Sequence, residues 1–280
     1  MKPEVRFLQQ PKSFWAIVKS LSEKIGYSKG GNIKIPTIDE MALAFNDLNL
    51  DSKKLILNDV PSSLAITLRD YFEYRAQILE EKVKPKLMNS EKAKEVFSEL
   101  KNKLSPTIPF PMNKQKGEKK AEAFFTCIIN MIIESELKGK SFDHDPRRLT
   151  AVTKNGIPLR TLSRRVDGAF PSVINPIAIW EIKEYYYTTT FGSRIADGVY
   201  ETLLDGLELE ELRESEGINV NHYLMVDAYN TWWIQGKSYL CRMVDMLHMG
   251  YVKEILFGYE VVEELPRIIS EWLSIVPLDN

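Results

Sequence analysis

The sequence is poor in the residues on which several common kinds of site depend. It has two cysteines, Cys127 and Cys241, and three histidines in 280 residues, and the cysteines form no CxxC pair. Both cysteines lie in apolar helical patterns, so we expect two reduced core thiols rather than a disulfide or a zinc site. The sequence contains no glycine-rich phosphate loop and no Ser-His-Asp pattern, which argues against an ATPase and against a serine hydrolase.

Long apolar runs are also missing. No stretch of about eighteen apolar residues occurs, so we expect no transmembrane helix. The first six residues, Met1–Arg6, carry no apolar signal region, which favours a cytoplasmic location. With 44% apolar residues and five tryptophans, the composition still predicts a well-packed protein. The length allows one large domain, or a core domain with a smaller one.

Basic residues are few in the last part of the chain and concentrated in the middle. Residues 201–280 carry fifteen acidic residues against five basic ones, whereas residues 82–120 carry eleven lysines against four acidic residues. A basic segment that leads into a site can follow a phosphate backbone. A solvated, lysine-rich surface explains the same run equally well.

Prolines divide the chain into two parts. Helical patterns occur over residues 11–25, 37–48, 62–82 and 89–104. Three prolines then follow within the six residues 106–111, and they cannot lie inside a helix. We therefore predict an N-terminal helical domain over residues 1–104, with a role in DNA recognition, a proline-rich linker over 105–115 and a second domain over 116–280.

The second domain alternates between helices and strands. The pattern predicts a helix over 118–137, strands over 149–153, 158–162, 164–170 and 177–186, a helix over 193–214, a strand over 222–228 and a helix over 238–256. The first two of these segments form either one strand or a hairpin around the turn Asn155-Gly156. With residues 149–162 counted as one unit, this order predicts an α/β fold with an αβββαβ core, in which a mixed central sheet is flanked by helices.

The most informative pattern is a pair of charges inside an apolar strand. The chain has six acid-x-Lys triplets, and only Glu181-Ile182-Lys183 follows a strand pattern. Side chains alternate along a strand, so Glu181 and Lys183 point to the same face. Asp167 comes alongside them if the two strands around residues 171–176 pair antiparallel. Two carboxylates beside an ammonium resemble a phosphodiester-cleaving site in outline, and the alternative is an ordinary ion pair on an edge strand.

Asp167 followed by Glu181-x-Lys183, inside the αβββαβ order, resembles the PD-(D/E)xK nuclease superfamily of restriction-endonuclease-like fold. The resemblance covers residues 116–256, with Val166 where the family name has proline. It implies a metal-dependent nuclease in which Asp167 and Glu181 bind Mg²⁺, or Mn²⁺ in its place, and Lys183 is catalytic. Many relatives add an acidic residue from the preceding helix. Glu122 is the favoured candidate for that catalytic, metal-binding position, and Glu134 is the alternative.

The function that this resemblance implies is a type II-like restriction or anti-phage defence endonuclease that cuts double-stranded DNA. One site cuts one strand, so double-strand cleavage implies a homodimer. The candidate DNA contacts are Lys116, Lys119, Lys120, Arg164 and Arg194. Two alternatives remain open: a structure-specific repair or recombination nuclease of the junction-resolvase kind, and a non-catalytic nucleic-acid-binding module.

Overall fold

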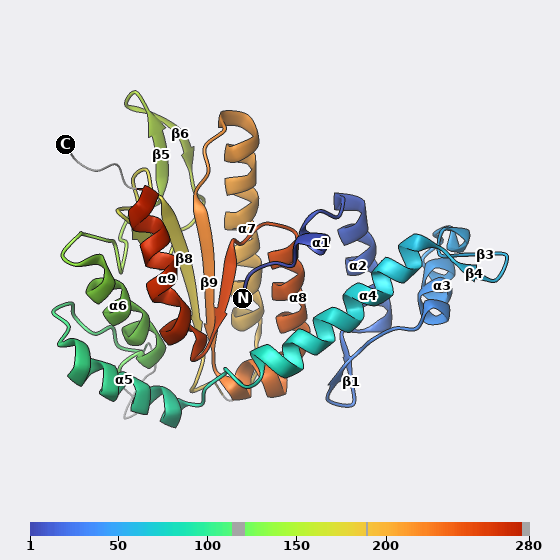
Figure 1. Ribbon diagram of the computed structural model, residues 1–280, viewed down its shortest axis with the longest axis horizontal. Coiled ribbons are helices and arrows are strands. Elements are labelled where there is room, and N and C mark those ends of the chain that lie inside the picture. Colours follow the sequence, from blue (N-terminus) through green and yellow to red (C-terminus); the bar gives the residue numbers. More distant parts are fainter. Residues whose placement is uncertain (114–120, 189, 276–280) are drawn as a thin grey trace.

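A mixed sheet of four strands lies between two layers of helices in the computed structural model of the protein, which is about half helical (Figure 1). The structure describes residues 1–113, 121–188 and 190–275. The strands are β7 (Gly168–Phe170), β8 (Ala178–Glu184), β9 (Asn221–Asp227) and β10 (Glu254–Phe257). Their order is β10-β9-β8-β7, with β7 antiparallel to β8 and the other neighbours parallel.

A separate hairpin precedes this sheet. It consists of β5 (Ala151–Lys154) and β6 (Ile157–Thr161), which pair antiparallel. Asn155 and Gly156 between them have φ of 53° and 77°. Two positive φ angles in a two-residue loop are typical of the hairpin turn for which Asn-Gly is preferred. Of the two predicted alternatives, the hairpin is confirmed.

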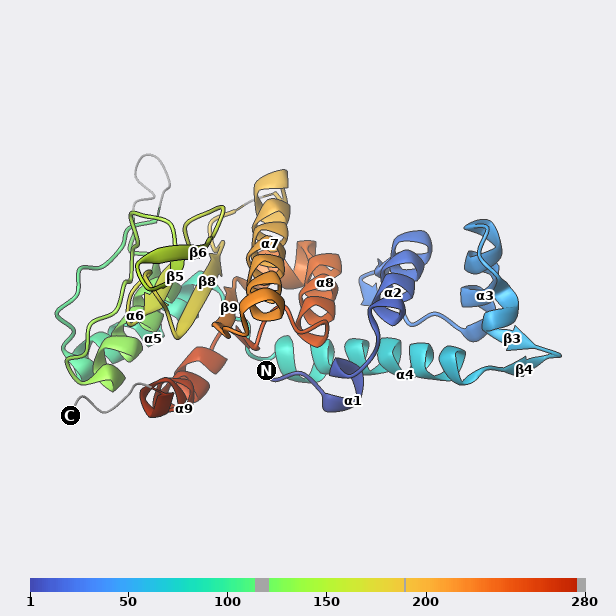
Figure 2. The same ribbon diagram turned by 90° about the horizontal axis from the view of Figure 1, so that it is seen from above.

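Helices cover both faces of the sheet (Figures 1 and 2). The two on one face are α7 (Ser193–Glu216) and α8 (Lys237–His248), and the two on the other are α6 (Phe124–Leu137) and α9 (Glu260–Ile275). Because side chains alternate along β8, one face of this strand carries apolar residues and the other carries Glu181 and Lys183. Trp180 stacks on Trp272 of α9, with ring centroids 5.4 Å apart, while Glu181 and Lys183 face α7. No helix among the described residues is long and apolar enough to cross a membrane.

The N-terminal region has a core of its own, but Tyr27, Ile33 and the buried residues of 76–83 pack on the sheet instead. The elements of this region are α1 (Val5–Leu8), α2 (Lys12–Ile25), β1 (Ser28–Lys29), β2 (Asn32–Ile33), α3 (Ile38–Asp47), η1 (Ser52–Lys54), β3 (Ile56–Leu57), β4 (Val60–Pro61), α4 (Ser63–Ile78) and η2 (Leu79–Val83). The predicted cap of α3 is confirmed: Thr37 Oγ1 accepts from Glu40 N, and Glu40 Oε2 accepts from Thr37 N. Such a reciprocal pair satisfies two N–H groups that the helix start leaves free.

A buried ion pair joins this region to the rest of the protein. Arg75 of α4 is 1% exposed, and its Nη1 lies 3.0 Å from each carboxylate oxygen of Asp245 on α8. The Tyr71 hydroxyl donates to the same carboxylate at 2.5 Å. These contacts fix the long helix α4, which runs beside the other N-terminal helices in Figure 2, against the helical layer of the sheet.

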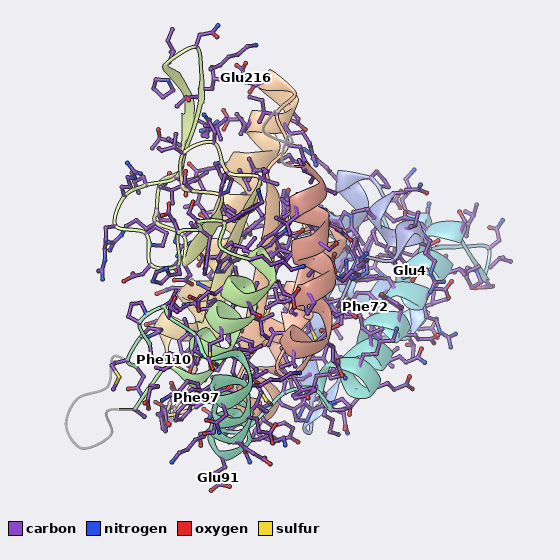
Figure 3. All side chains as sticks on the ribbon, turned by 60° about the vertical axis from the view of Figure 1, so that its left-hand side comes forward. Glu4, Phe72, Glu91, Phe97, Phe110 and Glu216 are labelled. Atoms are coloured by element: carbon purple, nitrogen blue, oxygen red, sulfur yellow. The ribbon has the colours of Figure 1, made fainter. Side chains whose placement is uncertain are left out.

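The helix before the proline segment belongs by its packing with the sheet. We predicted it as part of the N-terminal domain, but the buried face of α5 (Ser90–Leu104) packs on α6. Figure 3 shows Phe97 of α5 close to Phe110 of the proline segment, and their ring centroids are 5.2 Å apart. Prolines end a helix, but they do not decide which core the preceding helix joins.

Two predicted helices have different bounds in the structure. The helix predicted over 118–137 begins at Phe124, and Glu122 instead forms an antiparallel bridge with Met112. The helix predicted over 238–256 ends at His248, and the chain then forms strand β10. A short apolar run fits a buried strand as well as a buried helix, so periodicity alone could not separate the two. Both cysteines are free and buried, as predicted.

Asp227 is the last residue of β9, and its carboxylate accepts a hydrogen bond from the segment that precedes α5. Its Oδ1 accepts from Met88 N at 2.7 Å and from Ala228 N at 2.9 Å, and the Tyr186 hydroxyl donates to Oδ2. The residue is fully buried, and this burial raises the pKa of the Asp227 carboxyl to about 8.

We expect Asp227 to make the folded protein less stable as the pH rises from about 4 to about 8. In this window the unfolded carboxyl has lost its proton while the folded one retains it, so the free energy of unfolding falls by up to about 1.4 kcal/mol per pH unit. Asp227→Asn keeps an acceptor for both N–H groups and removes the titration, so its stability should fall less. Urea unfolding at pH 5 and pH 8 tests this, and equal pH dependence in the two proteins would contradict it.

Candidate functional site

The strand pair β7–β8 brings two carboxylates together. Asp167 directly precedes β7; its N–H donates to Trp180 O at 3.2 Å, and its Oδ2 accepts from Ile182 N at 2.8 Å. These bonds place Asp167 beside Glu181. The close approach of the strands requires glycine at the next position, because a Cβ on Gly168 would lie 2.1 Å from the Trp180 ring. The Asp-Gly sequence thus has a packing cause.

Glu181 is completely buried between two cations. Lys183, which is 4% exposed, lies with Nζ 2.7 Å from Glu181 Oε2. Arg164 approaches from the loop before β7, with Nη2 2.9 Å from Oε2 and Nη1 2.8 Å from Oε1. Burial alone would raise the pKa of Glu181, but Lys183 and Arg164 outweigh it and hold that pKa below its ordinary value. Glu181 is therefore ionised at neutral pH.

Two further acidic residues reach this site from α7. Asp205, fully buried, accepts from Arg164 Nη1 at 2.6 Å. Glu201 lies one turn earlier, 3.4 Å from Arg164 Nη2 and 3.5 Å from Lys183 Nζ. Sequence reasoning missed both residues. The available signal was the spacing of Glu201, Asp205 and Glu208, which lie four and three residues apart and so share one face of a helix.

We call this group the charge cluster, and it consists of Asp167, Glu181, Glu201, Asp205, Arg164 and Lys183. Its four carboxylates exceed its two cations by two negative charges. Asp167 is exposed as a residue, but the protein around its carboxylate desolvates that group in part. This desolvation and the charge of Glu181 raise the pKa of Asp167 to about 6, and the same two causes raise the pKa of Asp205 to about 7. Each shift means that these carboxyl groups keep a proton to a higher pH than an exposed aspartate does.

Two buried oxygens of the cluster lack a hydrogen bond within the described part of the chain: Glu181 Oε1 and Asp205 Oδ1. Glu181 Oε1 has its ionic contact with Arg164, but without hydrogen-bond geometry. Leaving buried carboxylate oxygens without donors is costly. Unsatisfied hard oxygens and a surplus of two negative charges are the conditions that suit a divalent cation.

The predicted ligands of Mg²⁺ or Mn²⁺, Asp167 and Glu181, are adjacent carboxylates, and Glu181 keeps one oxygen without a hydrogen bond, so the chemistry of this pair fits such an ion. Among the residues that the structure describes, no group of three or more acidic, histidine or cysteine side chains is arranged to hold a metal. A cation here would thus depend on two carboxylates and on water. Mg²⁺ keeps several of its waters and is commonly bound through one or two carboxylates together with substrate phosphates.

The structure does not bring the predicted helix acids to the charge cluster. Glu122 lies on the opposite side of β8, where, after burial, its charge contributes to the raised pKa values of Cys127 and Tyr187. Glu134 accepts hydrogen bonds from Thr107 N at 3.1 and 3.2 Å and so holds the proline segment. Both predictions assumed that the helix before the strands faces the site, but α6 covers the other face of the sheet.

The predicted DNA contacts are only partly described. Lys116, Lys119 and Lys120 lie outside the described residues. Arg194 lies in the first turn of α7, and its side chain is also outside them. Arg164 is described, and its guanidinium contacts three carboxylates of the charge cluster instead of lying free on the surface.

Two family models match this α/β chain. A domain of unknown function (DUF7687) matches residues 88–272, and a second domain of unknown function (DUF7690) matches residues 1–82. The first match covers more than half of the chain, so the protein belongs to the DUF7687 family. No curated protein and no solved structure matches it. The border between the two matches falls just before α5, in agreement with the packing of α5 on α6.

Proposed function

We propose that the protein is a metal-dependent endonuclease that hydrolyses DNA phosphodiester bonds, of the type II-like restriction or anti-phage defence kind. The observation that carries this proposal is the placement of Asp167, Glu181 and Lys183 at one site. The carboxylates of Asp167 and Glu181 are adjacent, and Lys183 Nζ lies 2.7 Å from Glu181. The three residues lie on or next to the antiparallel strands β7 and β8, which are followed by helix α7 and the parallel strand β9. This arrangement agrees with the resemblance to the PD-(D/E)xK nucleases.

The charge states of the three residues suit this chemistry. A divalent cation bound by Asp167 and Glu181 would polarise the phosphodiester and acidify a water molecule. Burial would lower the pKa of Lys183, but Glu181 and Asp167 raise it above its ordinary value, so its ammonium does not act as a base at neutral pH. Lys183 instead supplies a fixed positive charge where negative charge develops on the phosphoryl oxygens.

Double-stranded DNA is the proposed partner. Cutting both strands with one such site per chain requires either two copies of the chain or two successive encounters, and we propose a homodimer. The strongly acidic face of α7 repels a phosphate backbone, so DNA would approach from the side of Asp167, which is exposed and lies outside α7.

Cleavage is expected to require Mg²⁺ or Mn²⁺, to stop with excess chelator, and not to be supported by Ca²⁺. Ca²⁺ binds oxygen ligands but in a looser geometry and with more of them. The measurement is the conversion of supercoiled plasmid with each ion alone. Full activity in excess chelator would contradict the proposed role of Asp167 and Glu181.

A further inference from the structure

Arg164 occupies a divided position in the charge cluster. Its Nη2 donates to Glu181 at 2.9 Å, whereas its Nη1 directs its hydrogen bond to Asp205 at 2.6 Å. Glu201 contacts it at 3.4 Å from the same helix as Asp205. Arg164 is therefore shared between two kinds of partner. Glu181 is a proposed ligand of the divalent cation, whereas Asp205 and Glu201 of α7 are not.

We propose that Arg164 is a positioning residue that competes with a divalent cation for Glu181, and that Asp205 and Glu201 hold its guanidinium beside the site. This inference rests on the proposed function. It gives Arg164 control over the affinity of Asp167 and Glu181 for the cation.

Elementary electrostatics supports the competition. A guanidinium keeps its proton at any physiological pH, so Arg164 can leave Glu181 only by moving. A cation beside Glu181 repels it, and this repulsion is strong because the site is buried. Asp205 provides the alternative partner: it is fully buried, already accepts the shorter hydrogen bond, and has an oxygen without a donor.

Glu181 and Asp205, which both accept hydrogen bonds from Arg164, differ in how many cations each of them contacts. Lys183 makes a hydrogen bond of 2.7 Å to Glu181 Oε2, so this carboxylate keeps one cation if Arg164 moves. Asp205 has no such second partner, because Arg164 provides its only ion pair among the described residues. Arg164 therefore has more to gain from Asp205 than from Glu181.

The direct test is Mn²⁺ binding to the full-length protein in the absence of DNA, measured by isothermal titration calorimetry. Arg164→Gln removes the competitor, and we expect it to bind Mn²⁺ at least about tenfold more tightly than the wild type, which corresponds to about 1.4 kcal/mol. Arg164→Lys keeps a charge at this position and should bind more weakly than Arg164→Gln. Arg165→Gln, at the exposed neighbouring arginine, is the control for a general change of charge and should bind as the wild type does.

A second pair of variants keeps the test valid if Arg164→Gln fails to fold. Asp205→Asn removes the alternative charged partner, whereas Glu208→Gln removes one charge from the same helix at a residue that binds Ser163 instead. We expect Asp205→Asn to weaken Mn²⁺ binding several-fold more than Glu208→Gln does. Thermal unfolding establishes that each variant is folded.

The outcomes separate this inference from the proposed function. If the wild type binds Mn²⁺, and both Arg164→Gln and Asp205→Asn bind no differently from their controls, Arg164 is only a structural ion-pair residue and the inference is overturned. If neither the wild type nor Arg164→Gln binds Mn²⁺, the proposed function and the inference both fail. Tighter binding by Arg164→Gln that is lost in the double variant with Glu181→Gln supports both.

Discussion

Replacing Lys183 with alanine is expected to lower the rate of DNA cleavage at least about a hundredfold, because the variant loses a fixed charge that stabilises the transition state. The fold should persist, because Arg164 still contacts both oxygens of Glu181 and leaves no buried charge unpaired. The measurement is the initial rate of plasmid cleavage in Mg²⁺, together with thermal unfolding of each protein.

Lys138→Ala is the matched control for this prediction. Lys138 ends the triplet Glu136-x-Lys138 and is exposed, so its loss should leave the rate unchanged. Asp167→Ala and Glu181→Ala are also expected to abolish cleavage, and Glu181→Gln is the better variant because it leaves a side chain of the same shape between two cations. Near-normal cleavage by Lys183→Ala would show that the site is assigned to the wrong residues.

Replacing Asp245 with alanine is expected to destabilise the protein by about 3–5 kcal/mol, since the change leaves the buried Arg75 guanidinium with the Ser22 hydroxyl but without its anionic partner. Arg75 is 1% exposed, and Tyr71 loses its acceptor in the same variant. Because this ion pair joins α4 to α8, the loss should also weaken the attachment of the N-terminal region to the sheet.

Urea unfolding measures this effect, and α4, the helix that carries Arg75, also offers a control. Arg69→Ala removes an exposed pair with Glu73 and should cost less than about 1 kcal/mol. Replacing both partners with apolar residues, Arg75→Met with Asp245→Leu, should recover much of the loss, because no unpaired charge then remains. A loss below about 1 kcal/mol in Asp245→Ala would mean that water reaches Arg75.

Local chemistry was readable from the sequence. The capping box of Thr37 and Glu40, the hairpin at Asn155-Gly156, and the shared face of Glu181 and Lys183 each depend on residues a few positions apart. Their geometry follows from a turn type, a helix start or the alternation of a strand. The sequence also predicted the mixed α/β architecture with an antiparallel strand beside parallel ones.

Tertiary contacts were not readable in the same way. Whether Glu122 or Asp205 reaches Glu181 depends on which helix covers which face of the sheet, and no local pattern decides this. Which residues Arg164 and α5 contact also depends on how the helices pack on the sheet. Pairs of charges that meet only after folding, such as Arg75 and Asp245, leave no signal in sequence spacing because 170 positions separate them.

The most direct test of the nuclease proposal is to incubate the wild-type protein and Lys183→Ala with several long DNAs and Mg²⁺ and to separate the products on a gel. The proposal predicts discrete fragments from the wild type and intact DNA from the variant. Cleavage of branched DNA alone would indicate a structure-specific nuclease instead. Intact DNA in every wild-type reaction, or the same fragments from both proteins, would contradict the assignment of Asp167, Glu181 and Lys183 as a DNA-cleaving site.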